Sequence, residues 1–317
     1  MEYVLTVTLP IYLGIALGYV VVMLGWFEPA EVKTLGKYTV RIGVPAVLFK
    51  SLAQQTPAAV FQLDYLAIYA AGSIAAMAIV AWTAWRGLKR PIGLAILQGL
   101  GASSSNSMFV GYPIVVQVIG PIAGVALALC MLVENLLVIP VALALMESAA
   151  HGGRESAWRT IVGTLKNVAR NPMILAILAG LMASLTGLHL PLALERFVAM
   201  TASATSPVAL FVIGGSLVGL KLSGIRSDIA LIVAGKLLLH PLCILGLVLL
   251  FPPENHLLGT AAVLIAAMPM MSIYPVLAQR DGHERLCSAA LLAATVSSFF
   301  TIGLGLAWLP ATWLPAH

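Results

Sequence analysis

Apolar runs long enough to cross a lipid bilayer follow one another along almost the whole chain. A helix that spans the hydrocarbon core needs roughly 20 predominantly apolar residues. Ten such runs are present, separated by short gaps that hold glycine, proline and most of the charged residues. They are 4–24, 36–53, 65–85, 93–119, 122–148, 171–188, 198–219, 228–250, 258–279 and 286–309. The sequence therefore predicts an all-α integral membrane protein with ten transmembrane helices.

The scarcity of charge excludes a soluble protein of this length. Only 9% of the residues are charged, against roughly 25% in an average soluble domain. The formal charge of +5 does not indicate nucleic-acid binding, because the basic residues are spread over the gaps between apolar runs. The expected surroundings are a lipid bilayer, with no nucleic acid as partner.

The distribution of Lys and Arg predicts the orientation. With the N-terminus outside, the cytoplasmic gaps hold thirteen basic residues and the external gaps only Arg196. The thirteen are Lys33, Lys37, Arg86, Lys89, Arg90, Arg154, Arg159, Lys166, Arg170, Lys221, Arg226, Arg280 and Arg285. Cytoplasmic loops of membrane proteins carry this excess. We expect a multi-pass protein of the inner (plasma) membrane with both termini outside.

The two halves of the chain resemble each other at an offset of 162 residues. Five of the eight prolines before residue 150 have a proline at this offset, and several glycines and aromatic residues also recur. The matching pairs include Gly18 and Gly180, Pro45 and Pro207, Phe49 and Phe211, Tyr112 and Tyr274, and Pro113 and Pro275. Each unit holds five spans, so the second is inverted, as is typical of secondary transporters. The predicted repeats are 1–148 and 171–317, joined by a basic cytoplasmic linker, 149–170.

Spans four and nine contain helix-breaking residues at corresponding positions. Span four carries a serine cluster with an asparagine and a Gly-x-Pro, and span nine carries two prolines six residues apart. Irregular backbone at membrane depth survives only where it lines a cavity or is buried in protein, and matched breaks indicate a transporter's binding site. The candidate substrate-binding residues are Ser105, Asn106, Ser107, Gly111, Pro113, Ser272, Tyr274 and Pro275. The alternative is a pair of simple kinks, with serines bonded to their own helix.

Several polar residues lie within the apolar runs. Ionisable groups at this depth are costly and usually functional. We assign a coupling or charge-relay role to Lys236 and His240 in span eight and to Glu134 and Asn135 in span five. The alternative is a structural ion pair that fixes two helices. Arg41 and Lys50 lie toward opposite ends of span two, where long side chains can extend to the membrane surface.

Several strings resemble the auxin efflux carrier family. They are NSMFVGYP (106–113), LPIYLGIALGYVV in span one, RIGVPAVLFKSLA in span two, KLLLHP (236–241) and the MP…LAQ stretch of span nine. The bacterial, malonate-carrier-like branch is similar in layout. The resemblance implies two inverted five-helix repeats in which the broken spans four and nine cross. Spans 1, 2, 6 and 7 would form a scaffold and spans 3–5 and 8–10 a mobile transport domain.

This combination predicts a secondary transporter of a small organic anion, such as a mono- or dicarboxylate, that works by alternating access. The second half of span four would offer its positive N-terminal end to a carboxylate, with Lys236 close by. No cofactor is expected; the coupling ion, a proton or sodium or none, is left open. A homodimer through the scaffold helices is compatible with this arrangement.

The sequence leaves three alternative functions to distinguish. A sodium-coupled symporter of the bile-acid type has a similar crossed-helix arrangement and would differ in its sodium dependence. A membrane receptor or sensor without transport would need a signalling domain. An enzyme is not expected, because the chain has no carboxylate pair, histidine-rich cluster or nucleophile–base spacing. No metal site is predicted either, since Cys130, Cys243 and Cys287 lack metal-ligand spacing.

Overall fold

The computed structural model describes residues 2–151, 154–188, 190–219, 226–279 and 281–308. All regular secondary structure in this part of the chain is helical, apart from one isolated antiparallel bridge. The all-α prediction is therefore confirmed. Lys221 and Arg280, two of the basic residues used for the orientation, lie outside the described residues, as do residues 152 and 153 of the linker.

Within the described residues, the first half of the chain forms nine α-helices. They are α1 (Glu2–Met23), α2 (Pro29–Tyr38), α3 (Val44–Ala53), α4 (Pro57–Val60), α5 (Leu63–Trp82), α6 (Ile92–Ser103), α7 (Tyr112–Ile119), α8 (Ala123–Val133) and α9 (Ile139–His151). The second half forms eight more. They are α10 (Arg154–Ala169), α11 (Pro172–Thr186), α12 (Leu192–Leu217), α13 (Arg226–Ala234), α14 (His240–Leu250), α15 (His256–Ala266), α16 (Tyr274–Leu277) and α17 (Glu284–Trp308).

Proline explains an unusual feature of several of these helices. Four of the five π-helical turns in the described residues come directly before an X-Pro pair, whose prolines are Pro45, Pro113, Pro140 and Pro241. Proline donates no N–H bond, and its ring collides with the carbonyl four residues back. In each case the residue before the proline bonds the carbonyl five residues back, as Val44 bonds Thr39. The helix widens there instead of ending.

Five helical stretches of the described chain are long and apolar enough to cross a membrane. They are Pro57–Gly87, Ser107–Ala150, Leu192–Leu217, Arg226–Leu250 and Glu284–Ala307. A sixth is obtained if Trp158–Ala169 and Pro172–Thr186, bent by 61°, form one span. Other predicted spans fall on shorter apolar helices, such as Leu9–Met23, Ile92–Ser103 and His256–Ala266. The chain is thus a multi-pass helical protein, while the count of ten spans stays a prediction.

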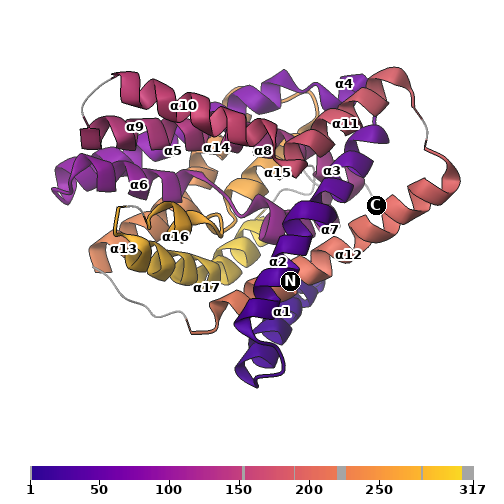
Figure 1. Ribbon diagram of the computed structural model, residues 1–317, viewed down its shortest axis with the longest axis horizontal. Coiled ribbons are helices and arrows are strands. Elements are labelled where there is room, and N and C mark those ends of the chain that lie inside the picture. Colours follow the sequence, from indigo (N-terminus) through magenta and orange to yellow (C-terminus); the bar gives the residue numbers. More distant parts are fainter. Residues whose placement is uncertain (1, 152–153, 189, 220–225, 280, 309–317) are drawn as a thin grey trace.

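The helices fall into two groups that lie side by side in Figure 1. One group holds α1, α2, α3, α11 and α12, in which α1 packs on α12 and α3 packs on α11. The other holds α5, α6, α9 and α13–α17, in which α5 packs on α6 and α14, and α17 on α13 and α16. The helices α7 and α8 lie between them, since α7 contacts α1 and α15, and α8 contacts α3 and α5.

Glycines let the helices of the first group approach backbone to backbone. An added Cβ at Gly18 of α1 would overlap the carbonyl oxygen of Phe211 in α12. One at Gly180 of α11 would lie 3.0 Å from the carbonyl oxygen of Phe49 in α3. Gly43, before α3, faces Thr205 of α12, whose Oγ1 would lie 2.6 Å from such a Cβ. Close packing by small residues is the usual way for helices to associate in lipid.

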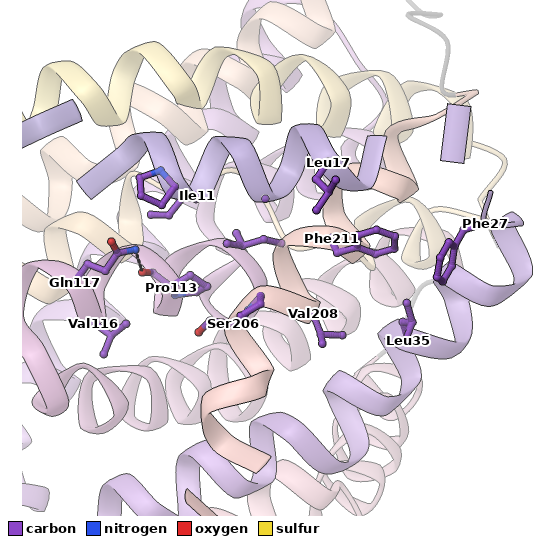
Figure 2. A pocket seen from close by; sticks show the side chains of 14 residues that line it. Ile11, Leu17, Phe27, Leu35, Pro113, Val116, Gln117, Ser206, Val208 and Phe211 are labelled. Carbon is purple, nitrogen blue, oxygen red and sulfur yellow. Dashed lines mark hydrogen bonds between the residues drawn. The ribbon is translucent and has the colours of Figure 1, made fainter. Parts of the chain in front are cut away.

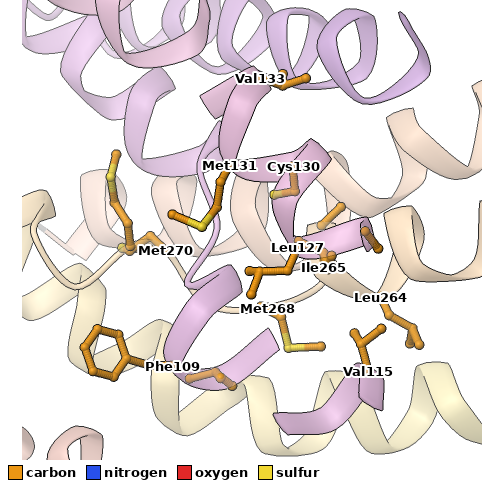
Figure 3. Packing of buried hydrophobic residues seen from close by; sticks show 14 of the residues in the cluster. Phe109, Val115, Leu127, Cys130, Met131, Val133, Leu264, Ile265, Met268 and Met270 are labelled. Atoms are coloured by element: carbon orange, nitrogen blue, oxygen red, sulfur yellow. The ribbon is translucent and has the colours of Figure 1, made fainter. Parts of the chain in front are cut away.

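Apolar side chains surround the region where α6, α7, α8 and α15 meet. Figure 3 shows Phe109, Leu127, Cys130, Met268 and Met270 gathered there, and all five are buried. Most residues of the non-helical segments between α6 and α7 and between α15 and α16 are thus buried in protein, with Ile273 at the exposed end of the second segment. This enclosure is what irregular backbone at membrane depth requires.

Gly214 gives a test of the close packing between α1 and α12. Its added Cβ would overlap the carbonyl of Ile15, a backbone atom that cannot turn away. We expect Gly214→Ala to destabilise the protein by about 1–3 kcal/mol, as overpacking does. Gly303→Ala is the matched control, because nothing lies within 4 Å of a Cβ there. Melting of both purified variants measures the difference; equal melting temperatures would contradict this packing.

Candidate functional site

The breaks in α6–α7 and α15–α16 meet in space. The first helix ends at Ser103, and Ser104 is extended with φ −115° and ψ 138°. The second ends at Ala266, and helix resumes only at Tyr274. The two segments run antiparallel past each other at Ser105 and Met270. The backbone N–H of Asn106 donates to the carbonyl of Pro269 at 2.7 Å.

Asn106 ties the crossing together through its side chain as well. Its amide nitrogen donates to Ser272 Oγ at 2.8 Å, and its Oδ1 accepts from the N–H of Phe109 at 3.3 Å. The second bond caps the π-helical turn Ser107–Gly111. Asn106 is buried. An asparagine offers two donors and one acceptor group, so in this structure it links both broken segments and starts the next helix.

Lys236 lies beneath the crossing and reaches both breaks. Its Nζ donates to Ser105 Oγ at 2.9 Å and to the carbonyl of Ala266 at 2.6 Å. It also lies 2.8 Å from His240 Nδ1. Its side chain is fully buried. An ammonium has three donors, so all three are used, and one of them pairs the carbonyl of Ala266, which the second break leaves without a helical partner.

Glu134 binds the crossing from the other side. Its Oε1 accepts from the backbone N–H of Ser105 at 2.7 Å and from the hydroxyl of Tyr69 at 3.2 Å. The carboxylate and the ammonium of Lys236 do not touch directly, because Ser105 lies between them and bonds both. The two charges are therefore joined through Ser105, and both stabilise the crossing, so the alternative of a structural ion pair that fixes two helices stays a prediction beside the charge relay.

The polar groups form one continuous chain. Because the Lys236 ammonium only donates, His240 Nδ1 accepts, and Nε2 then donates to Ser73 Oγ at 3.0 Å. Ser105 Oγ also lies 3.3 Å from the Tyr69 hydroxyl, which donates to Glu134. Hydrogen bonds thus run without interruption from Ser73 through Lys236 and Ser105 to Glu134. The sequence analysis did not single out Tyr69 and Ser73, which lie one turn apart in α5. Two polar residues spaced by one helical turn within an apolar run were the sequence pattern that could have indicated them.

The other predicted residues divide between the crossing and its surroundings. Tyr274 is buried against Gly101 and donates its hydroxyl to the carbonyl of Leu97. Gly111 faces Met268, whose Cγ would lie 3.4 Å from an added Cβ. Asn135 bonds the carbonyl of Met131 in its own helix, so the structure does not bring it into the polar chain. Ser107 is buried at the start of the π-helical turn, and Pro275 is half-buried in the short helix α16.

An apolar cavity of about 620 Å³ lies between α1, α2, α7 and α12. Figure 2 shows Pro113, Val116 and Gln117 at one end, Phe27 and Leu35 at the other, and Ser206 between. Pro113 is the one predicted site residue on its wall. The cavity therefore begins beside the broken helix but does not open onto Asn106.

A second cavity, of about 430 Å³, has a polar wall. It shares Val116 and Ser206 with the apolar cavity. The residues around it come from α3, α7 and α12 and from the turns after α3 and α7. Its polar members are Lys50, Ser51, Gln54, Gln55, Tyr112, Ser203 and Ser206. None of them was among the predicted site residues, although Lys50, a charge inside an apolar run, was the signal that pointed here.

The described residues contain no group of three or more His, Cys, Asp or Glu side chains that could hold a metal ion. What they contain is a buried polar chain at the crossing of two broken helices, beside cavities large enough for a small solute. This combination in a multi-pass helical protein is typical of membrane transport proteins.

Comparison with known proteins identifies the family. Residues 3–304 match the family described as "Membrane transport protein". The chain belongs to this family, that of the auxin efflux carriers, and hence to transporters rather than enzymes.

Curated relatives match along nearly their whole length. A "Putative malonate transporter" of Rhizobium meliloti is 27% identical over 295 residues, covering 93% of this chain and 92% of that protein. "Uncharacterized transporter YfdV" of Escherichia coli is 25% identical over 296 residues, with 92% of each chain covered. An "Uncharacterized transporter" of Methanothermobacter thermautotrophicus is 25% identical over 297 residues, covering 92% of this chain and 93% of that protein.

A double-mutant cycle tests the link between the two buried charges. Lys236→Met and Glu134→Gln should each lower stability strongly, by about 3–5 kcal/mol, because each leaves the other charge uncompensated. The double variant should cost less than the sum of the two, by about 0.5–3 kcal/mol. Unfolding of the purified variants in denaturant measures this. Lys236→Met combined with Glu31→Gln, in α2 of the other helix group, is the control pair and should be additive. Additivity in both pairs would contradict the link.

Proposed function

We propose that this protein is a secondary transporter of a small organic anion, a mono- or dicarboxylate, that works by alternating access around the crossed, broken helices. The observation that carries this proposal is the crossing itself. Two unwound segments from opposite halves of the chain pair at Ser105 and Met270, directly over a buried lysine. Broken helices that meet near mid-membrane are the usual binding site of secondary transporters.

The contacts between helices support an inverted repeat. If residues 162 apart are related by a two-fold axis, the contact of Gly18 with Phe211 requires a second contact between Gly180 and Phe49. Both contacts are present. A residue close to this axis would contact the residue to which the repeat relates it. Gly43 does face Thr205, which lies 162 residues further along the chain. We propose repeats at 1–148 and 171–317 on this basis.

Polar contacts at helix starts support the same symmetry. At the start of α5, Asp64 accepts from the backbone N–H of Glu254 at 2.8 Å. At the start of α13, Asp228 pairs with Arg90 at 2.9 Å. The repeat offset of 162 residues relates position 64 to position 226, and position 254 to position 92. These two positions lie within two residues of Asp228 and Arg90, which form the second contact. Helices α5 and α13 would then begin at opposite membrane surfaces, as predicted spans three and eight do.

We further propose that the two groups of helices in Figure 1 are the two working parts of the transporter. The group of α1–α3, α11 and α12 corresponds to predicted spans 1, 2, 6 and 7, the scaffold. The other group, together with α7 and α8, corresponds to spans 3–5 and 8–10, the transport domain. The cavities support this division, since both lie where α7 faces α12 across the two parts. The linker 149–170, which contains α10, would connect the repeats on the cytoplasmic side.

The anion would bind at the start of the π-helical turn Ser107–Gly111, which continues into α7. The break leaves the N-terminal end of that helical segment at the crossing, where the partial positive charge of a helix start favours a carboxylate. The proposed substrate-binding residues remain Ser105, Asn106, Ser107, Gly111, Pro113, Ser272, Tyr274 and Pro275. In this structure Asn106 is bonded to Ser272 and Phe109, so an incoming carboxylate would replace the Ser272 contact. The relative from Rhizobium meliloti is named as a malonate transporter, and this name supports the choice of a carboxylate.

Protons fit the site better than sodium as the coupling ion. A sodium site built from unwound backbone needs free carbonyls, and two carbonyls at the breaks are already bonded. Ala266 accepts from Lys236, and Pro269 accepts from Asn106. The chain of N–H and O–H groups between His240 and Glu134 is suited to moving a proton. We therefore propose Glu134, Lys236 and His240 as the relay and leave Asn135 outside it.

Transport assays test this function. In proteoliposomes we expect saturable counterflow of labelled malonate, inhibited by unlabelled dicarboxylates and unchanged when potassium replaces sodium. An imposed pH gradient should change the rate, because the relay would load and release protons. Absence of counterflow with every mono- and dicarboxylate tried would refute the proposal. A strict need for sodium would favour the bile-acid type of symport.

Reporter tags test the proposed orientation. Tags at both termini and near residues 57 and 255 should be accessible from outside the cell, and tags near residues 88 and 155 from the cytoplasm. The reason is the excess of thirteen basic residues over one in the predicted cytoplasmic gaps. A C-terminal tag found inside would remove both the orientation and the five-helix inverted unit.

A further inference from the structure

We propose that the polar cavity beside Lys50 is a carboxylate-binding subsite on the transport path, with Lys50 as the cation that selects anions. This inference rests on the proposed function, because it names the part of the path that recognises the charge of the substrate. The cavity lies between α3 of one helix group and α7 at the edge of the other. It is separate from the Lys236 chain, none of whose members lines it.

Lys50 is a cation without a partner. It lies in the last turn of α3 and is half-buried. It forms no hydrogen bond or ion pair with any described residue. The carboxylate of Glu195 lines a small neighbouring cavity together with Lys50. Glu195 instead accepts from Gln54 Nε2 at 3.3 Å, and it is not within ion-pair distance of Lys50. An unpaired ammonium on a cavity wall is available to a ligand.

The rest of the wall supplies neutral donors. Tyr112 and Ser206 contribute hydroxyls, and Gln55 contributes an amide. Ser203 is exposed to the space and offers its oxygen there, since its hydroxyl already donates to the carbonyl of Ala199 at 2.8 Å. Ser51 sits against Gly124, where an added Cβ would overlap its hydroxyl. One cation surrounded by hydroxyls and amides matches a single carboxylate, since charged hydrogen bonds are the strong ones and neutral donors complete the coordination. A phosphate dianion would call for more positive charge.

The cavity is placed to receive a solute and pass it on. A volume of about 430 Å³ falls within the range of small-molecule sites. Through Val116 and Ser206 it adjoins the apolar cavity whose wall includes Pro113, next to the crossing. With the proposed orientation, Lys50 lies toward the external end of α3, so a carboxylate bound there would be on the outer side of the crossing. A dicarboxylate could keep one carboxylate on Lys50 while the other approaches α7.

The test is malonate binding to the purified full-length protein, followed by the rise in melting temperature with malonate concentration. Lys50→Gln should raise the apparent Kd for malonate about tenfold or more, because a charged hydrogen bond is lost. Lys50→Arg keeps the charge and should stay within about threefold of wild type. Arg196→Gln is the control, because it removes one exposed basic residue, placed on the same side of the membrane, that lines no described cavity.

A second variant covers the case in which Lys50→Gln lowers stability without ligand. Ser203→Asp leaves Lys50 in place but puts a competing carboxylate on the cavity wall, so malonate binding should again weaken about tenfold or more.

The outcomes separate the two proposals. Unchanged malonate affinity in both Lys50→Gln and Ser203→Asp would overturn the subsite and leave the transport function standing. The subsite would also be overturned if the Lys50→Gln variant keeps normal malonate affinity but no longer co-purifies with anionic lipid. In that case Lys50 would bind lipid headgroups and not the substrate. Wild-type protein that no mono- or dicarboxylate stabilises would refute the proposed function itself.

Discussion

A backbone group that leaves its helix inside a bilayer finds no water to bond, so the break must be paired by protein. In this protein the pairing is mutual. The carbonyl of Pro269 in one break accepts from the N–H of Asn106 in the other, and Lys236 donates to Ser105 and to the carbonyl of Ala266. Glu134 then accepts the N–H of Ser105. The crossing therefore depends on the buried charges of Lys236 and Glu134. The same hydrogen bonds that pair the groups at the breaks also hold these two side chains in place.

This arrangement gives the polar residues two roles that are difficult to separate. Asn106 caps a helical turn and joins the breaks, and Lys236 holds three acceptors at once. Any movement of the breaks relative to each other would exchange these bonds, and any proton moved along the chain would change them. Structural support and charge relay thus use the same atoms. The cavities are different, because the side chains on their walls keep free surface and Lys50 is unpaired among the residues that the structure describes.

Much of the helical layout could be predicted because lipid imposes a simple rule on the sequence. The apolar runs coincide with helices, and the breaks fall at the serines after Ser103 and the prolines of span nine, where backbone bonding fails. Lys236 and Glu134 were found because charge in an apolar run is costly. Tyr69 and the Lys50 cavity were not, because their contacts join helices far apart in the sequence. Asn135 was included as the neighbour of Glu134, yet adjacent residues on a helix face different sides.

The wide helical turns before Pro45, Pro113, Pro140 and Pro241 have a mechanical consequence. Each holds one residue more than an ordinary turn, and a helix rises about 1.5 Å per residue. Two of these turns contain Glu134 and Lys236, and a third begins directly after Asn106. Such turns concentrate at functional sites. The helices that carry the buried charges of Glu134 and Lys236 therefore each contain about one residue more than a regular α-helix of the same length would. A change of pitch at these turns can take up small displacements of the crossing while the distant ends of the helices stay in place.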